Sequence, residues 1–275
     1  MKYIKYILLG MAAGLFYGIS FINETSANVV DLYDIIFKLS FGEFLLCNSN
    51  AAYYDKIFLC LVPMLVFQIV SGTEIYRHFC LCGVYYFSRC SKRDKWLLRE
   101  TVRLLCFSVI NSFFIIFTFT IVVLFVFKSI SVQTSTFLLA VYYVLIFSLW
   151  NFLFSYMINV LAFKFKSDRA FFIAASSEVA MSLFYVMFQD SLYKIYDMDE
   201  RAVFIIKADP LSSLFISWHS SVNKDINSFI NIFDISFDLN FSLITVFLAC
   251  AALFLLSLKI VNSVELIESN KESGE

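Results

Sequence analysis

Charged residues are scarce in this sequence: Asp, Glu, Lys and Arg make up 16% of its 275 residues, whereas soluble domains carry roughly 25%. The formal net charge of −1 leaves no basic face for nucleic acid. Two histidines and two prolines are too few for a histidine-built metal cage or a proline-rich linker. The seven glycines never form the G-x-x-x-x-G-K-S/T loop that holds nucleotide phosphates, which excludes an ATPase site of that kind in the chain.

Apolar residues take the place of the missing charge. Hydrophobic residues make up 60% of the chain, 34 residues are Phe and the mean hydropathy is +0.79, which is typical of an integral membrane protein. The apolar runs do not alternate with polar residues, so they indicate helices rather than barrel strands. A hydrocarbon core of ~30 Å takes about 20 helical residues. The sequence therefore predicts one all-α transmembrane domain over residues 1–275 with six spans, at about 4–22, 57–73, 104–127, 134–161, 170–188 and 241–259.

The basic residues are divided unequally between the two faces of this predicted topology. Two thirds of the 21 Lys and Arg residues fall on the face that carries both termini and the loop 74–103. The positive-inside rule makes that face cytoplasmic, and it places the segment 189–240 outside. Of the seven cysteines only Cys47 lies on the outer face, so no disulfide can form there within the chain. The composition, rich in Ile, Phe and Asn, suggests a multi-pass protein of a bacterial inner membrane.

The cytoplasmic loop 74–103 is about thirty residues long, whereas the other inner loop has about seven. An aromatic run is followed by a short basic turn, and we expect a helix on either side of that turn. Three readings stay open: contact with anionic lipid headgroups, docking on a cytosolic partner, or positive-inside charge alone. His78 and three cysteines in this loop lack a C-x-x-C pair, so no metal site is predicted. The candidate docking residues are Tyr85, Tyr86, Phe87, Arg89, Lys92, Arg93, Lys95 and Trp96.

Gly10, Gly14 and Gly18 repeat every four residues in the first span. They therefore lie along one face of that helix, where a second helix can approach closely. The partner is either another span of the same chain or a neighbouring subunit.

Glu178 is an acidic residue near the middle of the fifth predicted span. An ionised carboxylate at that depth costs ~2.5–3.5 kcal/mol on insertion scales, so its side chain should face protein or water. Gln68, Asn111, Asn151 and Asn159 are possible partners from other spans. Glu178 either lines or gates a pathway, or it makes a structural hydrogen bond between helices.

The topology as a whole resembles the type-2 permeases of ATP-binding-cassette (ABC) exporters. The motifs that carry the resemblance are Glu74, Ser88 with Arg89, the basic stretch 92–103, and Asp209-Pro210-Leu211, where the family has an Asn-Pro-Leu-like element. The resemblance implies a coupling helix in the first inner loop that docks on a separate cytosolic ATPase chain. It also implies that ATP and Mg bind to that partner, that this chain holds no cofactor, and that a second copy or a related permease completes the pathway.

The function predicted on this basis is outward transport of an amphipathic substrate, such as a peptide, a lipid or a drug. The alternative is a membrane sensor or immunity protein that works without an ATPase. An enzyme is not predicted, because the chain lacks H-E-x-x-H and its two histidines, His78 and His219, fall on opposite faces of the membrane.

Overall fold

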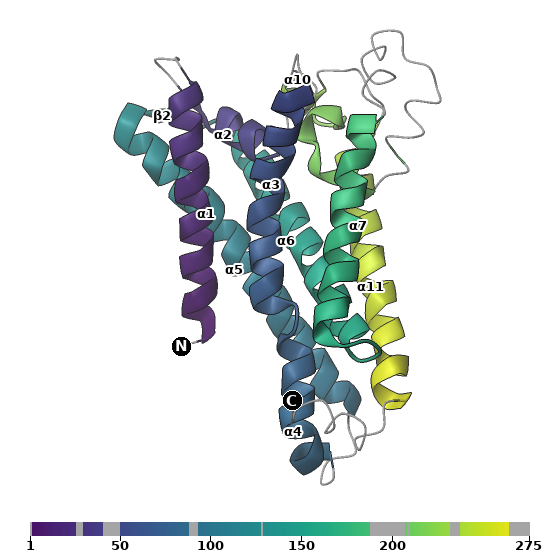
Figure 1. The fold of residues 1–275 in the computed structure, drawn as a ribbon. Coiled ribbons are helices and arrows are strands. Elements are labelled where there is room, and N and C mark those ends of the chain that lie inside the picture. The colour runs from purple at the N-terminus through teal and green to yellow at the C-terminus, as the bar shows by residue number, and fades with distance from the viewer. Residues whose placement is uncertain are drawn as a thin grey trace.

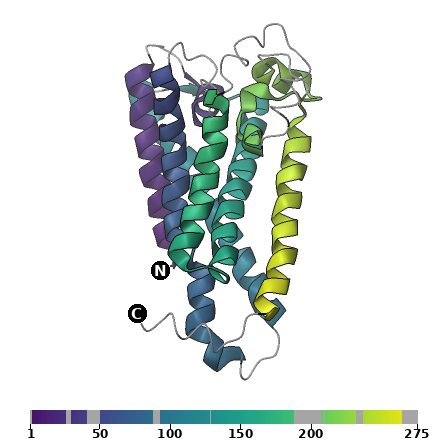
Figure 2. The same ribbon diagram turned by 45° about the vertical axis from the view of Figure 1, so that its right-hand side comes forward.

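Each of the six apolar runs falls on a long helix of its own, although the second, 57–73, continues past the end of its helix at Ser71 (Figure 1). The computed structural model describes residues 2–25, 30–40, 50–87, 93–127, 129–187, 207, 210–231 and 237–263, and within these it gives the backbone alone for residues 2, 50–60, 82–87, 184–187 and 210. The long helices are α1 (Lys2–Glu24), α3 (Asn50–Ser71), α5 (Arg93–Phe127), α6 (Thr134–Ala162), α7 (Ser167–Met187) and α11 (Leu239–Ser263). They run side by side and form one bundle (Figure 2).

Four of these helices, α1, α5, α6 and α11, are long and apolar enough to cross a membrane. The chain is thus an all-α, multi-pass membrane protein. Membrane crossing by α3 and α7, and the side on which the termini lie, stay predictions. The third span is part of a longer helix than expected, because α5 begins at Arg93 and continues for 35 residues.

The core of the bundle is built around α6. Buried side chains occur along its whole length, from Thr136 to Ala162, and the helix packs against α3, α5, α7 and α11. Trp150 and Phe154 lie edge to face, with ring centroids 5.0 Å apart. In contrast, α1 lies at the margin of the bundle and packs mainly on α5.

One end of the bundle carries a helical hairpin. After α3 a turn at Gly72 and Thr73 leads into α4 (Glu74–Phe87), which extends beyond the other helices, and α5 returns the chain to the bundle (Figure 1). We call α4 and the first turns of α5 the hairpin, and this end of the bundle the hairpin end. The first turn of α1 and the last turn of α11 lie at the same end.

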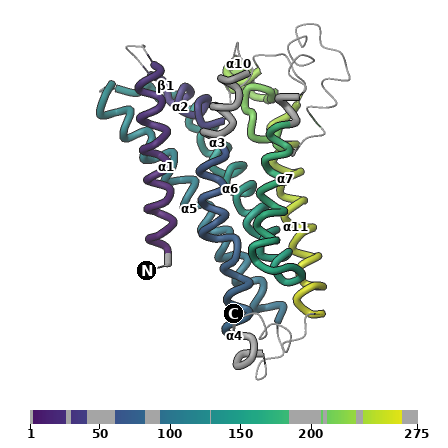
Figure 3. Tube along the Cα trace, viewed as in Figure 1, coloured from purple at the N-terminus to yellow at the C-terminus, as the bar shows by residue number. Residues whose placement is uncertain are grey.

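Short elements cover the opposite end, called here the cap end (Figure 3). They are β1 (Val30–Asp31), α2 (Leu32–Leu39), β2 (Ile130–Ser131), the 3-10 helices η3 (Pro210–Leu214) and η4 (Ile216–Trp218), and α10 (Lys224–Ile230). Strands β1 and β2 pair in parallel, with Val30 opposite Ile130. The Tyr33 hydroxyl donates to the Phe229 carbonyl oxygen at 2.7 Å, which ties α2 to the segment between α7 and α11.

Candidate functional site

The hairpin brings the two halves of the sequence-predicted docking loop together. Tyr85, Tyr86 and Phe87 form the last residues of α4, and Arg93 begins α5. Arg89 and Lys92 lie outside the described residues. The end of α4 at Phe87 and the start of α5 at Arg93 are therefore separated by only five residues of sequence, at the hairpin end.

Among the predicted docking residues whose burial the structure describes, which are Arg93, Lys95 and Trp96, Trp96 alone is buried. Its ring packs on Phe79 of α4, with centroids 5.8 Å apart, and Phe79 in turn meets the Phe163 ring edge to face at 5.0 Å. Lys95, the neighbouring residue, is exposed. Trp96 thus holds the two arms of the hairpin together, whereas Lys95 is available to a partner or to lipid.

Arg93 joins the hairpin to the end of α11. Its guanidinium donates to the carbonyl oxygen of Val261 at 3.0 Å, and Asn262 donates from Nδ2 to Asp94 Oδ1, also at 3.0 Å. The last carbonyl groups of a helix carry partial negative charge and lack partners within the helix, so a guanidinium stabilises them. The first basic residue of α5 therefore fixes the hairpin to the last long helix.

A second set of contacts joins the hairpin to α1 and closes it internally. The Lys5 ammonium pairs with Glu74 at the start of α4. Glu100 Oε2 lies 3.3 Å from both His78 Nδ1 and Arg103 Nη1, so one carboxylate serves groups from both arms. The hairpin is thereby linked to α1 and, through Arg93, to α11.

Asn159 of α6 fixes the start of the hairpin. Its Oδ1 accepts hydrogen bonds from the backbone N–H groups of Ile75 at 2.9 Å and Tyr76 at 3.1 Å. Its Nδ2 donates to the Ser155 carbonyl oxygen at 2.8 Å. The first N–H groups of a helix have no partner within it, and a side-chain oxygen can satisfy them. Asn159, which the sequence suggested as a possible partner of Glu178, therefore caps the N-terminus of α4 instead.

Glu178 contacts another of the predicted partners. Gln68 of α3 donates from Nε2 to Glu178 Oε2 at 2.7 Å, and both side chains are fully buried. Within the described part of the chain, the second oxygen of Glu178 and the amide oxygen of Gln68 have no hydrogen-bond partner. The neighbouring Ser177 and Ser182 donate to carbonyl groups of their own helix. The pair therefore joins α3 to α7 and leaves two acceptor oxygens in the core.

Replacing Gln68 by Leu is expected to destabilise the protein by about 1–3 kcal/mol, because it leaves the Glu178 carboxyl buried with no donor from α3. The double variant with Glu178→Leu should be more stable than Gln68→Leu alone, since both polar groups are then removed together. Thermal unfolding of the detergent-solubilised protein measures both effects. Ile69→Leu, a change at an exposed position of the same helix, is the matched control.

Strictly additive losses in the double variant would contradict a coupled pair. Glu178→Gln separates the two roles left open for this residue, because it keeps size and hydrogen bonding but cannot ionise. Normal stability with lost transport supports a pathway or gating role; normal stability with normal transport leaves the structural bond alone.

The glycine face of α1 lies against α5. A Cβ at Gly10 would sit 2.6 Å from the Asn111 carbonyl oxygen, and one at Gly18 would sit 2.7 Å from Val122 Cγ1. Even the single methyl group of alanine cannot fit at Gly10 or Gly18 unless the neighbouring part of α5 moves. The seam is therefore filled within the chain, and the opposite face of α1 is exposed and apolar.

The segment between α7 and α11 contains a buried contact that sequence reasoning missed. His219 Nε2 lies 2.8 Å from Ser242 Oγ and Nδ1 lies 2.7 Å from the Phe215 carbonyl oxygen, which can only accept. The neutral ring therefore carries its proton on Nδ1 and accepts from Ser242. Burial lowers the pKa of His219 to about 4. Both side chains are fully buried, so the contact is closed to a substrate and it fastens this segment to α11.

Of the predicted Asp209-Pro210-Leu211 motif, Asp209 lies outside the described residues, Pro210 begins η3 and Leu211 is buried. No local pattern marks His219 or Ser242, because their contact joins positions 23 residues apart.

No family model, curated protein or solved structure matches the chain. The four long apolar helices assign it to the multi-pass α-helical membrane proteins.

Proposed function

We propose that the chain is the membrane-spanning subunit of an ABC exporter, which moves an amphipathic substrate outward across a bacterial inner membrane. A separate cytosolic ATPase chain holds ATP and Mg, and a second copy of this chain or a related permease completes the pathway. The observation that carries the proposal is the hairpin, because it extends beyond the bundle and is tied to both α1 and α11.

A docking element must transmit displacement to the membrane helices as well as bind a partner. The contacts of Glu74 with Lys5 and of Arg93 with Val261 meet this requirement, because any shift of the hairpin displaces α1 and α11. Asn159 adds a link to the central helix α6. A loop that merely carried positive-inside charge would not need these three connections.

The aromatic end of α4 is expected to supply most of the binding free energy for the ATPase chain. Tyr86→Ala with Phe87→Ala should reduce the ATPase retained on the affinity-purified protein by at least about tenfold, because buried aromatic anchors dominate protein interfaces. Lys92→Gln with Lys95→Gln should reduce it less, since charges at the rim of an interface act mainly on association rate. Phe113→Ala with Phe117→Ala, at exposed positions in the middle of α5, is the matched control.

The measurement is ATP hydrolysis by protein solubilised from native membranes, with mass spectrometry to identify a chain that carries the G-x-x-x-x-G-K-S/T loop. Retention that neither hairpin pair affects would show that the ATPase binds elsewhere. If no such chain copurifies with the wild type, a sensor or immunity function without an ATPase is favoured over the exporter function.

A further inference from the structure

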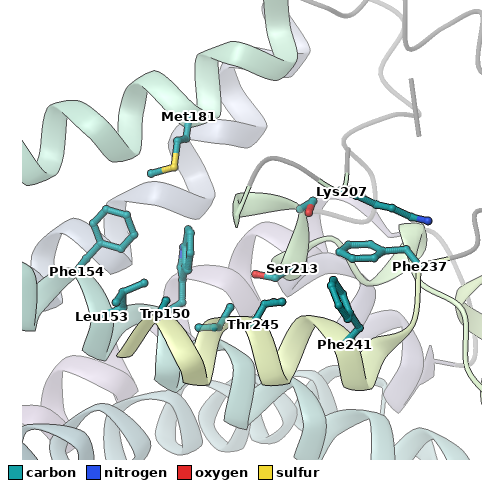
Figure 4. A pocket seen from close by; sticks show the side chains of 12 residues that line it. Trp150, Leu153, Phe154, Met181, Lys207, Ser213, Phe237, Phe241 and Thr245 are labelled. Carbon is teal, nitrogen blue, oxygen red and sulfur yellow. The ribbon is translucent and has the colours of Figure 1, made fainter. Parts of the chain in front are cut away.

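A cavity of about 290 Å³ lies between α6, α7, α11 and η3 (Figure 4). Phe154 and Met181 line one end of it, and Lys207, Phe237 and Phe241 line the other. Because Phe241 stands in the first turn of α11, the Lys207 end is the one that faces the cap end of the bundle. The cavity thus extends from the cap end toward the middle of the helices.

The chemistry of the lining changes along this axis. Aromatic and aliphatic side chains form the deep part, and Lys207 is the sole charged side chain among the described residues that line the cavity. This is also the order in which an amphiphile lies in a membrane leaflet, with its chain toward the centre and its headgroup at the surface. The two polarity gradients therefore run in the same direction.

Two polar groups of the lining lack partners within the described part of the chain. The Trp150 side chain is 1% exposed, and its indole N–H has no acceptor. Lys207 is exposed, and its ammonium makes no ion pair with any described residue. The ammonium group of Lys207 at the cap end therefore favours a ligand that carries a negative charge at one end over a plain hydrocarbon.

We propose that this cavity binds an anionic amphiphile with a single acyl chain. The chain lies between Trp150, Phe154 and Met181, and the anionic headgroup pairs with Lys207 at the cap end. The volume is at the lower limit of ligand sites, which range over about 300–1,000 Å³, so one chain fits better than the two chains of a phospholipid. Binding needs neither ATP nor a partner chain. The result of the binding test is therefore independent of whether the proposed exporter function is correct.

The test uses the full chain purified in a neutral detergent, with its tryptophan fluorescence as the signal. The probe is 9,10-dibromostearate, whose bromine atoms quench nearby indole rings, and its methyl ester has the same chain without the charge. We expect saturable quenching by the acid and weaker quenching by the ester. Trp150→Phe should remove most of the signal.

Matched variants separate the charge from the cavity. Lys207→Gln should raise the half-saturating concentration of the acid about fivefold and leave the ester unchanged. Lys224→Gln removes another exposed lysine of the same segment, outside the cavity, and should change neither. Ala249→Phe fills the cavity and should abolish quenching by both probes.

Three results would overturn the proposal. Equal quenching by acid and ester in the wild type would show that charge is not recognised. Quenching that survives Ala249→Phe would show that the probe reaches tryptophan from the micelle. Full protection by inorganic phosphate would show a site for small anions rather than for an acyl chain.

Discussion

Gly14→Leu is expected to abolish stable packing of α1 on α5. A Cβ at this position would lie 2.5 Å from the Ile115 carbonyl oxygen and 2.8 Å from Thr118 Cβ, and neither atom can move without displacing α5. Gly14→Ala should destabilise the protein by about 1–3 kcal/mol through overpacking, and the larger Leu side chain should prevent accumulation of folded protein. Yield after size-exclusion chromatography in detergent and the Tm measure the two effects.

Ala12→Leu is the control for the glycine seam. Ala12 is exposed on the same helix, two residues away, so the same side chain is added where nothing opposes it. Its yield and Tm should equal those of the wild type. Equal yields for Gly14→Leu and Ala12→Leu would mean that α1 does not pack on α5 along this face.

Acidification is expected to destabilise the cap end through His219. The unfolded side chain titrates near pH 6.5, whereas burial lowers its pKa in the folded protein to about 4. Between these values the unfolded state binds a proton that the folded state does not. The stability contributed by neutral His219 is therefore complete above pH 6.5 and is lost as the pH falls toward 4, by roughly 3 kcal/mol in total.

The measurement compares Tm at pH 7.5 and pH 5 in the wild type and in His219→Gln. Gln can donate to the Phe215 carbonyl oxygen and accept from Ser242 without titrating, so its Tm should fall less on acidification. His78→Gln changes the other histidine and leaves this contact intact, so it should keep the wild-type loss. An unchanged pH dependence in His219→Gln would show that another group is responsible.

The sequence was sufficient to locate the long helices but not all of their ends. Hydropathy marks the part of a helix that lipid can cover, so the third span was expected to start near residue 104. The helix continues outward to Arg93 because charged residues remain compatible with helix once it leaves the membrane, and residues 93–103 contain no Gly or Pro to end it. The buried residues Trp96, Leu97, Glu100, Thr101 and Leu104 follow helical spacing, a signal that could have shown Trp96 to face α4.

Sequence patterns could not predict which residues pair across long separations in the chain. Glu178 needed a polar partner, and four amides were available to it; only the placement of α3 beside α7 selects Gln68, 110 residues away. The same amides were chemically equivalent in the sequence, yet Asn159 became a helix cap. The cavity likewise depends on how far α6, α7 and α11 separate at the cap end, which no local pattern records.

The helices that connect the hairpin to the bundle differ in stiffness. On one side the path through α3 and α4 is interrupted by Pro63 and by the turn at Gly72. On the other side α5 runs without Gly or Pro for 35 residues, about 52 Å, against a hydrocarbon core of ~30 Å. It ends within three residues of β2, whose partner β1 leads into α2. A force applied at the hairpin would therefore bend α3 and α4 at Pro63 and Gly72. The same force would tilt the uninterrupted helix α5 as a rigid rod, and the far end of α5 would then move the strand pair at the cap end.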